Sequence, residues 1–121
     1  MRLPKHFLMR ILPVALGATC FCSTASAAGT ISGAQITGLY INTAYNMVFI
    51  STNLPKTGSP ACSYYNSPGT NEFVLPLGTT LQNETYALLL SARATGGTVT
   101  LTGSGLCDTY VDSETLQLVT Y

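Results

Sequence analysis

Beyond its first 27 residues, most of this chain has the pattern of strands and turns, and segments 98–107 and 114–121 alternate hydrophobic and polar residues with the two-residue period of a β-strand. Segment 29–42 is rich in β-branched and aromatic residues, and Gly33 and Gly38 interrupt it, as glycines do at a bulge or tight bend. Segment 47–52 (MVFIST) is apolar on both faces, so we expect a strand that is covered on both sides. Three further strands are predicted at 72–77, 98–107 and 114–121.

One segment, 81–97, has helical spacing instead. Thr79 and Gln82 have the spacing of a capping box, which predicts the start of the helix. Gly96 and Gly97 predict its end, because glycine readily adopts the left-handed conformation that closes many helices. The side chains expected to form its buried stripe recur every three or four residues: Leu81, Thr85, Leu88, Leu89 and Ala92.

The predicted order is therefore β-β-β-α-β-β, with a long, bent first strand and one helix between the third and fourth strands. This is the order of the OB-fold, a five-stranded Greek-key barrel. We accordingly predict an all-β fold with one helix, an OB-like barrel in which the helix plugs one end. A β-sandwich with one additional helix is the alternative.

The first 27 residues have the pattern of a signal peptide. A positively charged start (Arg2, Lys5, Arg10) precedes an apolar run, ILPVALGA, and a small-residue cleavage site, ASA. The run is far shorter than the roughly 20 residues that span a bilayer, so no membrane insertion is expected. We predict a signal peptide over 1–27, a single domain over 28–121, and a secreted or periplasmic location.

Cys62 and Cys107 are the two cysteines that remain beyond the predicted signal peptide. In an exported domain two cysteines are expected to pair. On the chain-entropy model, closing this loop would stabilise the fold by about 4 kcal/mol. The alternative, a reactive thiol, has no support, because residues 28–121 contain no histidine, and no lysine close to either cysteine in the sequence, to lower a thiol pKa.

The charged residues of 28–121 exclude several functions. Two basic residues, Lys56 and Arg93, stand against five acidic ones, which argues against nucleic acid as a partner. His6 lies in the signal peptide, so no histidine remains for a triad or for most zinc sites. A pair of carboxylates could serve a glycosidase, but no nucleophile and base can be named. We therefore expect no enzymatic activity and no cofactor.

The segment CDTYVDSE places the carboxylates of Asp108, Asp112 and Glu114 close together in the chain. Hard cations prefer such oxygen ligands, but the segment lacks the glycine and the alternate spacing of a calcium loop. We predict a solvated turn and no metal. Glu114 could instead have a structural role, in which it accepts hydrogen bonds from backbone donors of the turn.

Tyrosines are the polar groups that suggest a ligand. Tyr64, Tyr65 and Asn66 lie in a loop beside Cys62, and rings next to amides and hydroxyls suit a glycan or protein surface. The predicted disulfide would bring this loop beside the 108–114 turn, which adds Tyr110 to the predicted ligand-binding residues. A similar set lies around the first turn: Tyr40, Asn42 and Tyr45. Alternatively, the tyrosines cover the ends of the barrel, with their hydroxyls in water.

Segment 88–119 resembles a family of small exported bacterial proteins of unknown function. The family pattern is a leucine and alanine helix, an alternating strand, a Gly-x-Gly-x-Cys run and a following glutamate. Gly103, Gly105, Cys107 and Glu114 match this pattern. The resemblance implies no activity.

The predicted architecture is also similar to that of the receptor-binding B subunits of bacterial toxins with five B subunits, which form rings and bind cell-surface glycans. No residue motif carries this likeness, which is one of fold alone. From these features we predict an exported, non-catalytic binding module for a glycan or cell-surface receptor. The likeness to ring-forming subunits raises a homo-oligomer as an alternative to a monomer. The alternative is a periplasmic inhibitor or immunity-type protein that occludes a partner enzyme.

Overall fold

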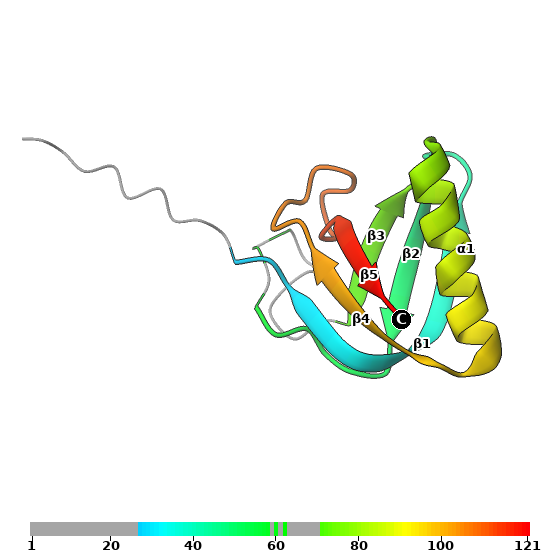
Figure 1. The fold of residues 1–121 in the computed structure, drawn as a ribbon. Helices are drawn as coiled ribbons and strands as arrows, with labels where there is room; N and C mark the ends of the chain where they lie inside the picture. Colours follow the sequence, from blue (N-terminus) through cyan, green and yellow to red (C-terminus); the bar gives the residue numbers. More distant parts are fainter. Residues whose placement is uncertain (1–26, 59, 61, 63–70) are drawn as a thin grey trace, which may run out of the picture.

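The protein is described here by a computed structural model that covers residues 27–58, 60, 62 and 71–121. Five strands and one helix follow in the predicted order (Figure 1): β1 (Thr30–Asn42), β2 (Met47–Thr52), β3 (Glu72–Pro76), α1 (Thr80–Thr95), β4 (Thr98–Gly103) and β5 (Leu116–Thr120). Within the part of the chain that is described, no helix has the length and apolar character needed to cross a membrane. The predicted signal peptide lies outside these residues except for Ala27.

The five strands form one sheet in the order β3-β2-β1-β4-β5, and all neighbouring strands are antiparallel. β1 is long enough to pair with β4 through its first half and with β2 through its second half. The register shifts between Ile31 and Ala34, where Gly33 has a φ of 64°, and again between Ile36 and Gly38. The bend predicted from the two glycines is therefore confirmed.

The edge strands β3 and β5 approach each other at one end of the sheet, and Figure 1 shows β5 between β4 and β3. A single parallel bridge joins Val74 to Thr115, and the Val74 amide donates to the Glu114 carbonyl at 2.9 Å. The two strands form no continuous ladder among the described residues. The five-stranded order is thus established, and closure into a barrel remains a prediction.

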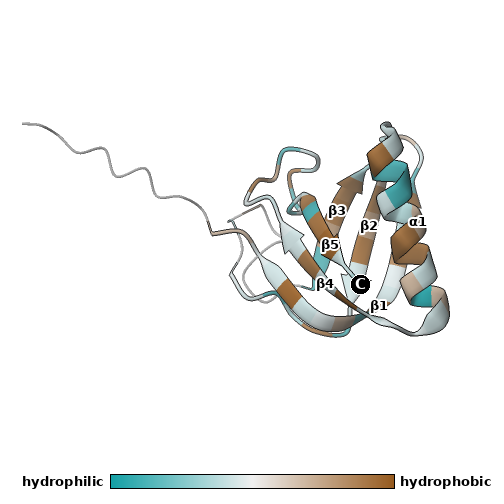
Figure 2. Ribbon diagram, viewed as in Figure 1, coloured by the Kyte–Doolittle hydropathy of each residue, from teal (hydrophilic) through white to brown (hydrophobic). Residues whose placement is uncertain are grey.

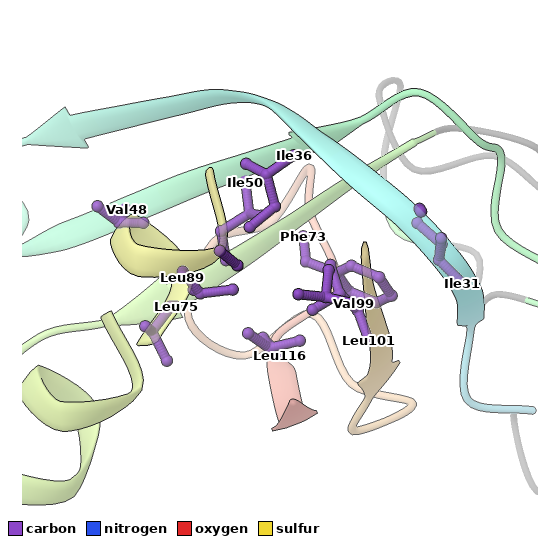
Figure 3. Packing of buried hydrophobic residues seen from close by; sticks show 12 residues of the cluster. Ile31, Ile36, Val48, Ile50, Phe73, Leu75, Leu89, Val99, Leu101 and Leu116 are labelled. Atoms are coloured by element: carbon purple, nitrogen blue, oxygen red, sulfur yellow. The ribbon is translucent and has the colours of Figure 1, made fainter. Parts of the chain in front are cut away.

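The core lies inside the curved sheet, where side chains from all five strands and the helix point toward one another (Figure 3). Figure 2 shows hydrophobic residues along β2 and β3 and on α1. The two-residue period of the strands sends alternate side chains inward. The largest of the fully buried side chains is that of Phe73.

The ends of α1 form as the sequence predicts. The Thr79 hydroxyl accepts from the Gln82 amide, and the Gln82 side chain accepts from the Thr79 amide, which completes the capping box. Gly96 closes the helix in the left-handed conformation with a φ of 68°.

The predicted buried stripe of α1 is wrong in part. Leu89 and Ala92 are fully buried, but Leu81 is 72% exposed and Leu88 is 37% exposed. The helix turns about 100° per residue, so Leu81 and Leu88 lie about 80–100° around its axis from Leu89. The main contacts of α1 with the sheet are those with β1 and β3, so a narrow stripe is covered and these two leucines fall outside it.

Two predicted strand ends also differ from the structure. β4 ends at Gly103 and not at Cys107, and β5 begins at Leu116 and not at Glu114. The intervening loop, residues 104–115, leaves the sheet and crosses to β3, where it forms the bridge to Val74. The predicted disulfide between Cys62 and Cys107 is present, with a distance of 5.6 Å between the Cα atoms, and it joins this loop to the segment after β2.

Candidate functional site

A shallow pocket on the outer side of the sheet brings three aromatic side chains around a carboxylate. It is lined by Tyr40 of β1, Phe49 of β2, Glu72 of β3 and Tyr110 of the 104–115 loop, and its volume is about 300 Å³. We call this pocket the aromatic groove. Tyr110, one of the predicted ligand-binding residues, thus lies in it.

The register of the β1–β2 hairpin determines the positions of Tyr40 and Phe49, which form two walls of the aromatic groove. Tyr40 and Phe49 are direct cross-strand partners, so their side chains leave the same face of the sheet. Gly38, two residues before Tyr40, has no side chain on that face. A Cβ atom there would lie 2.6 Å from the Tyr40 ring, so the ring rests directly on the glycine backbone.

Tyr110 forms the third aromatic wall. Its ring meets that of Phe49 edge to face, with centroids 5.1 Å apart and an interplanar angle of 87°. The two ring planes are therefore nearly perpendicular. Tyr110 also begins a tight turn, because its carbonyl accepts from the Ser113 amide at 3.2 Å.

The polar side of the aromatic groove is the carboxylate of Glu72, the first residue of the edge strand β3. The Ser113 hydroxyl donates to Glu72 Oε1 at 2.7 Å. This bond links β3 to the same turn that carries Tyr110. The orientation of the carboxylate and the position of the ring are therefore set by one short segment.

A buried ion pair between Glu114 and Lys56 anchors the 104–115 loop. Glu114 is fully buried, and its Oε1 accepts hydrogen bonds from the amides of Gly29 at 2.9 Å and Gly105 at 3.0 Å. Its Oε2 lies 3.6 Å from Nζ of Lys56, and both side chains are inaccessible to solvent. The expectation that Glu114 accepts hydrogen bonds from backbone donors is thus confirmed.

The ammonium group of Lys56 also lies 4.4 Å from the centroid of the Phe73 ring, a cation–π contact. Burial lowers the pKa of Lys56 from its ordinary value of 10.5, because desolvation disfavours the charged form. The carboxylates of Glu114 and, more weakly, Glu72 oppose this effect.

Two glycines make room for the Glu114 carboxylate. A Cβ atom at Gly103 would overlap the carboxylate itself, and one at Gly29 would lie 2.5 Å from Oε2. Gly103 and Gly105 of this chain both serve the buried acid: a side chain at Gly103 would displace the carboxylate, and the Gly105 amide donates to it.

The arrangement separates Glu114 from the two acids that precede it. Asp108 accepts a hydrogen bond from the Thr115 hydroxyl within the loop, whereas Glu114 points inward to Lys56. In the described ranges, no three His, Cys, Asp or Glu side chains are grouped as metal ligands.

Of the predicted ligand-binding residues, Tyr64, Tyr65 and Asn66 lie outside the residues that the structure describes. Phe49 and Glu72 were not predicted as binding residues, and Tyr40 was named only as part of the similar set around the first turn. One signal in the sequence points to Tyr40 and Phe49. A four-residue turn over 43–46 between two strands pairs Tyr40 with Phe49 directly, which makes an aromatic cross-strand pair.

Comparison with protein-family models, with curated proteins and with solved structures found no match to this chain.

Proposed function

We propose that the chain is an exported, non-catalytic binding module that binds glycans at the aromatic groove. The observation that carries the proposal is the grouping of Tyr40, Phe49 and Tyr110 around the Glu72 carboxylate. Aromatic faces pack on the apolar faces of sugar rings, and a carboxylate accepts hydrogen bonds from sugar hydroxyls. Tyr40, which is 62% exposed, is available for such stacking.

The position of the aromatic groove also supports the proposal. In OB-folds, oligonucleotides and oligosaccharides bind at the face of strands 2 and 3 and at the loops between strands 1 and 2 and between strands 4 and 5. Phe49 and Glu72 lie on the second and third strands, and Tyr110 lies in the loop between the fourth and fifth. Because the basic residues are few, an oligosaccharide fits this surface better than a nucleic acid does.

Export is part of the proposal, and two features support it. The predicted signal peptide directs the chain out of the cytoplasm. The Cys62–Cys107 disulfide suits an oxidising compartment such as the periplasm or the extracellular space. The proposed homo-oligomer is checked by the mass of the purified protein in solution.

A glycan array with residues 28–121 tests the proposed function. We expect the wild type to bind a glycan. Tyr40→Ala and Tyr110→Ala should each weaken the affinity at least about tenfold, as the loss of one aromatic side chain at a binding site does. Tyr45→Ala is the matched control, because Tyr45 is 67% exposed on the hairpin turn and does not line the aromatic groove. Loss of binding in all three variants, or in none, would contradict the proposed site.

An array without any glycan signal would contradict the glycan function itself. It would favour the inhibitor alternative, in which the domain occludes a partner enzyme. A gene for a toxin or hydrolase next to the gene of this chain would support that alternative further.

A further inference from the structure

The shape of the aromatic groove is unusual for a surface that only stacks on flat sugar rings. The planes of Phe49 and Tyr110 meet at 87°, and Tyr40 adds a third ring beside them. Tyr40 offers an exposed face to a sugar ring. The two perpendicular walls beside it present several ring surfaces to a compact group.

The charge of the aromatic groove is negative. Glu72 lines it, and Asp108 and Asp112 belong to the loop that carries Tyr110. The charges of Lys56 and Glu72 interact. However, the Lys56 side chain is inaccessible to solvent, and its ammonium group faces Glu114. Arg93, the other basic residue after the predicted signal peptide, lies in the last turn of α1, which contributes no residue to the aromatic groove.

Aromatic rings attract a cation through the negative potential of their faces, and a set of such rings recognises quaternary ammonium groups. A carboxylate at the rim adds a direct charge interaction. We propose that the aromatic groove binds an alkylammonium group, with Tyr40, Phe49 and Tyr110 as the walls and Glu72 as the counter-charge. The inference rests on the proposed function and specifies it: the glycan bound here carries a positively charged amine.

Choline is the probe for this proposal, and 3,3-dimethyl-1-butanol is its control, because the neutral alcohol has the same shape with carbon in place of nitrogen. Binding is measured by titration calorimetry and by tyrosine fluorescence of residues 28–121. We expect choline to bind about tenfold more tightly than the neutral alcohol, as one cation–π contact and one partly exposed charge pair together predict. Equal binding of both compounds, or binding of neither, would overturn the proposal.

Two variants locate the binding. Glu72→Gln keeps the side-chain shape and should remove most of the preference for choline over the alcohol. Tyr40→Leu removes one wall at an exposed position, so it keeps the fold even if Glu72→Gln does not. Tyr45→Leu is the control and should leave the preference unchanged. An unchanged preference in Tyr40→Leu would overturn the proposal.

Glucosamine and N-acetylglucosamine identify the source of the charge, because acetylation removes the charge of the amine and keeps the sugar. Stronger binding of glucosamine supports an amino sugar as the ligand, and stronger binding of choline than of glucosamine supports an alkylated head group. If neutral glycans bind at the aromatic groove without any preference for a cation, the proposed function stands and this inference fails. If choline binds with the expected preference and no glycan binds, alkylammonium binding at the aromatic groove stands and the proposed glycan function fails.

Discussion

Glu114 is the residue on which most of the loop geometry depends. Its side chain accepts hydrogen bonds from the amides of Gly29 and Gly105, and its carbonyl accepts one from the amide of Val74. One residue therefore joins the start of β1, the 104–115 loop and the edge strand β3. Because that loop carries Tyr110, the position of one wall of the aromatic groove depends on a residue that does not line the groove.

Replacing Gly103 tests how closely the cradle fits. In Gly103→Ala the new methyl group would overlap the Glu114 carboxylate, which must move away from its hydrogen-bond donors. We expect the free energy of unfolding to fall by about 2–3 kcal/mol, measured by urea denaturation. Gly78→Ala is the control, because its nearest neighbour would be 3.9 Å away, and it should change stability little. Equal effects of the two substitutions would contradict the cradle.

A double-mutant cycle measures the buried ion pair. Glu114→Gln leaves the buried Lys56 ammonium without its closest carboxylate, so we expect a loss of about 3 kcal/mol in the free energy of unfolding. Adding Lys56→Met removes the buried ammonium group that has lost Glu114 and should restore more than half of that loss. If the two changes are simply additive, the pair is not coupled as described.

The lowered pKa of Lys56 predicts a change of stability in the alkaline range. Because the folded-state pKa lies below 10.5, the unfolded chain holds this proton more tightly than the folded protein does. The contribution of Lys56 to the free energy of unfolding therefore rises as the pH increases from the folded-state pKa toward 10.5. The measurement is the free energy of unfolding of the wild type and of Lys56→Met across this pH range. In the difference between the two proteins, the contributions of the tyrosine ionisations cancel. A difference that falls with pH would contradict the sign.

At the scale of the elements, the disulfide and Glu114 hold the 104–115 loop from two sides. Cys107 ties the loop to Cys62, and Glu114 ties it to β1 and β3. The loop therefore presents Tyr110 at a fixed place although it has no continuous strand pairing. This is how a segment outside the regular sheet can form one wall of the aromatic groove.

Removing the disulfide should loosen this surface before the core. For Cys62→Ala with Cys107→Ala we expect a loss of about 4 kcal/mol in the free energy of unfolding on the chain-entropy model. Hydrogen exchange should accelerate first in 104–115, because β1 to β4 keep their ladders. Uniform acceleration over the whole domain would show that the bond stabilises the core and the loop alike.

The elements were predictable because their signals are local. The capping box, the closing glycine, the alternating strands and the bend at Gly33 each depend on a few neighbouring residues, and the structure contains all of them. The rotation of α1 was not predictable to the same degree. Leu81 and Leu89 are equally apolar in the sequence, and only the position of β1 and β3 decides which of them is covered.

The binding surface was predictable only in part for a similar reason. Tyr110 was found through the disulfide, which the sequence predicts from compartment and cysteine number. Glu72 was not found, because its place beside Tyr110 depends on the loop crossing to β3, a contact between distant parts of the chain. The Lys56–Glu114 pair was missed for the same reason.

At the scale of the whole molecule, the aromatic groove is the ligand site that we propose for this domain. The groove draws residues from three strands and one loop, so it exists only in the folded chain. A second pocket lies between α1, β3 and β5, lined in part by the exposed Leu81, and it offers a distinct surface on the same molecule.

The most direct test is to map ligand contacts by amide chemical-shift changes in residues 28–121, with the strongest glycan from the array as the ligand. We expect the largest changes at Tyr40, Phe49, Glu72 and Tyr110, and we expect Glu72→Gln to reduce them. Changes centred on Leu81 and Leu116 in the second pocket, or confined to residues 64–66, would contradict the proposed site.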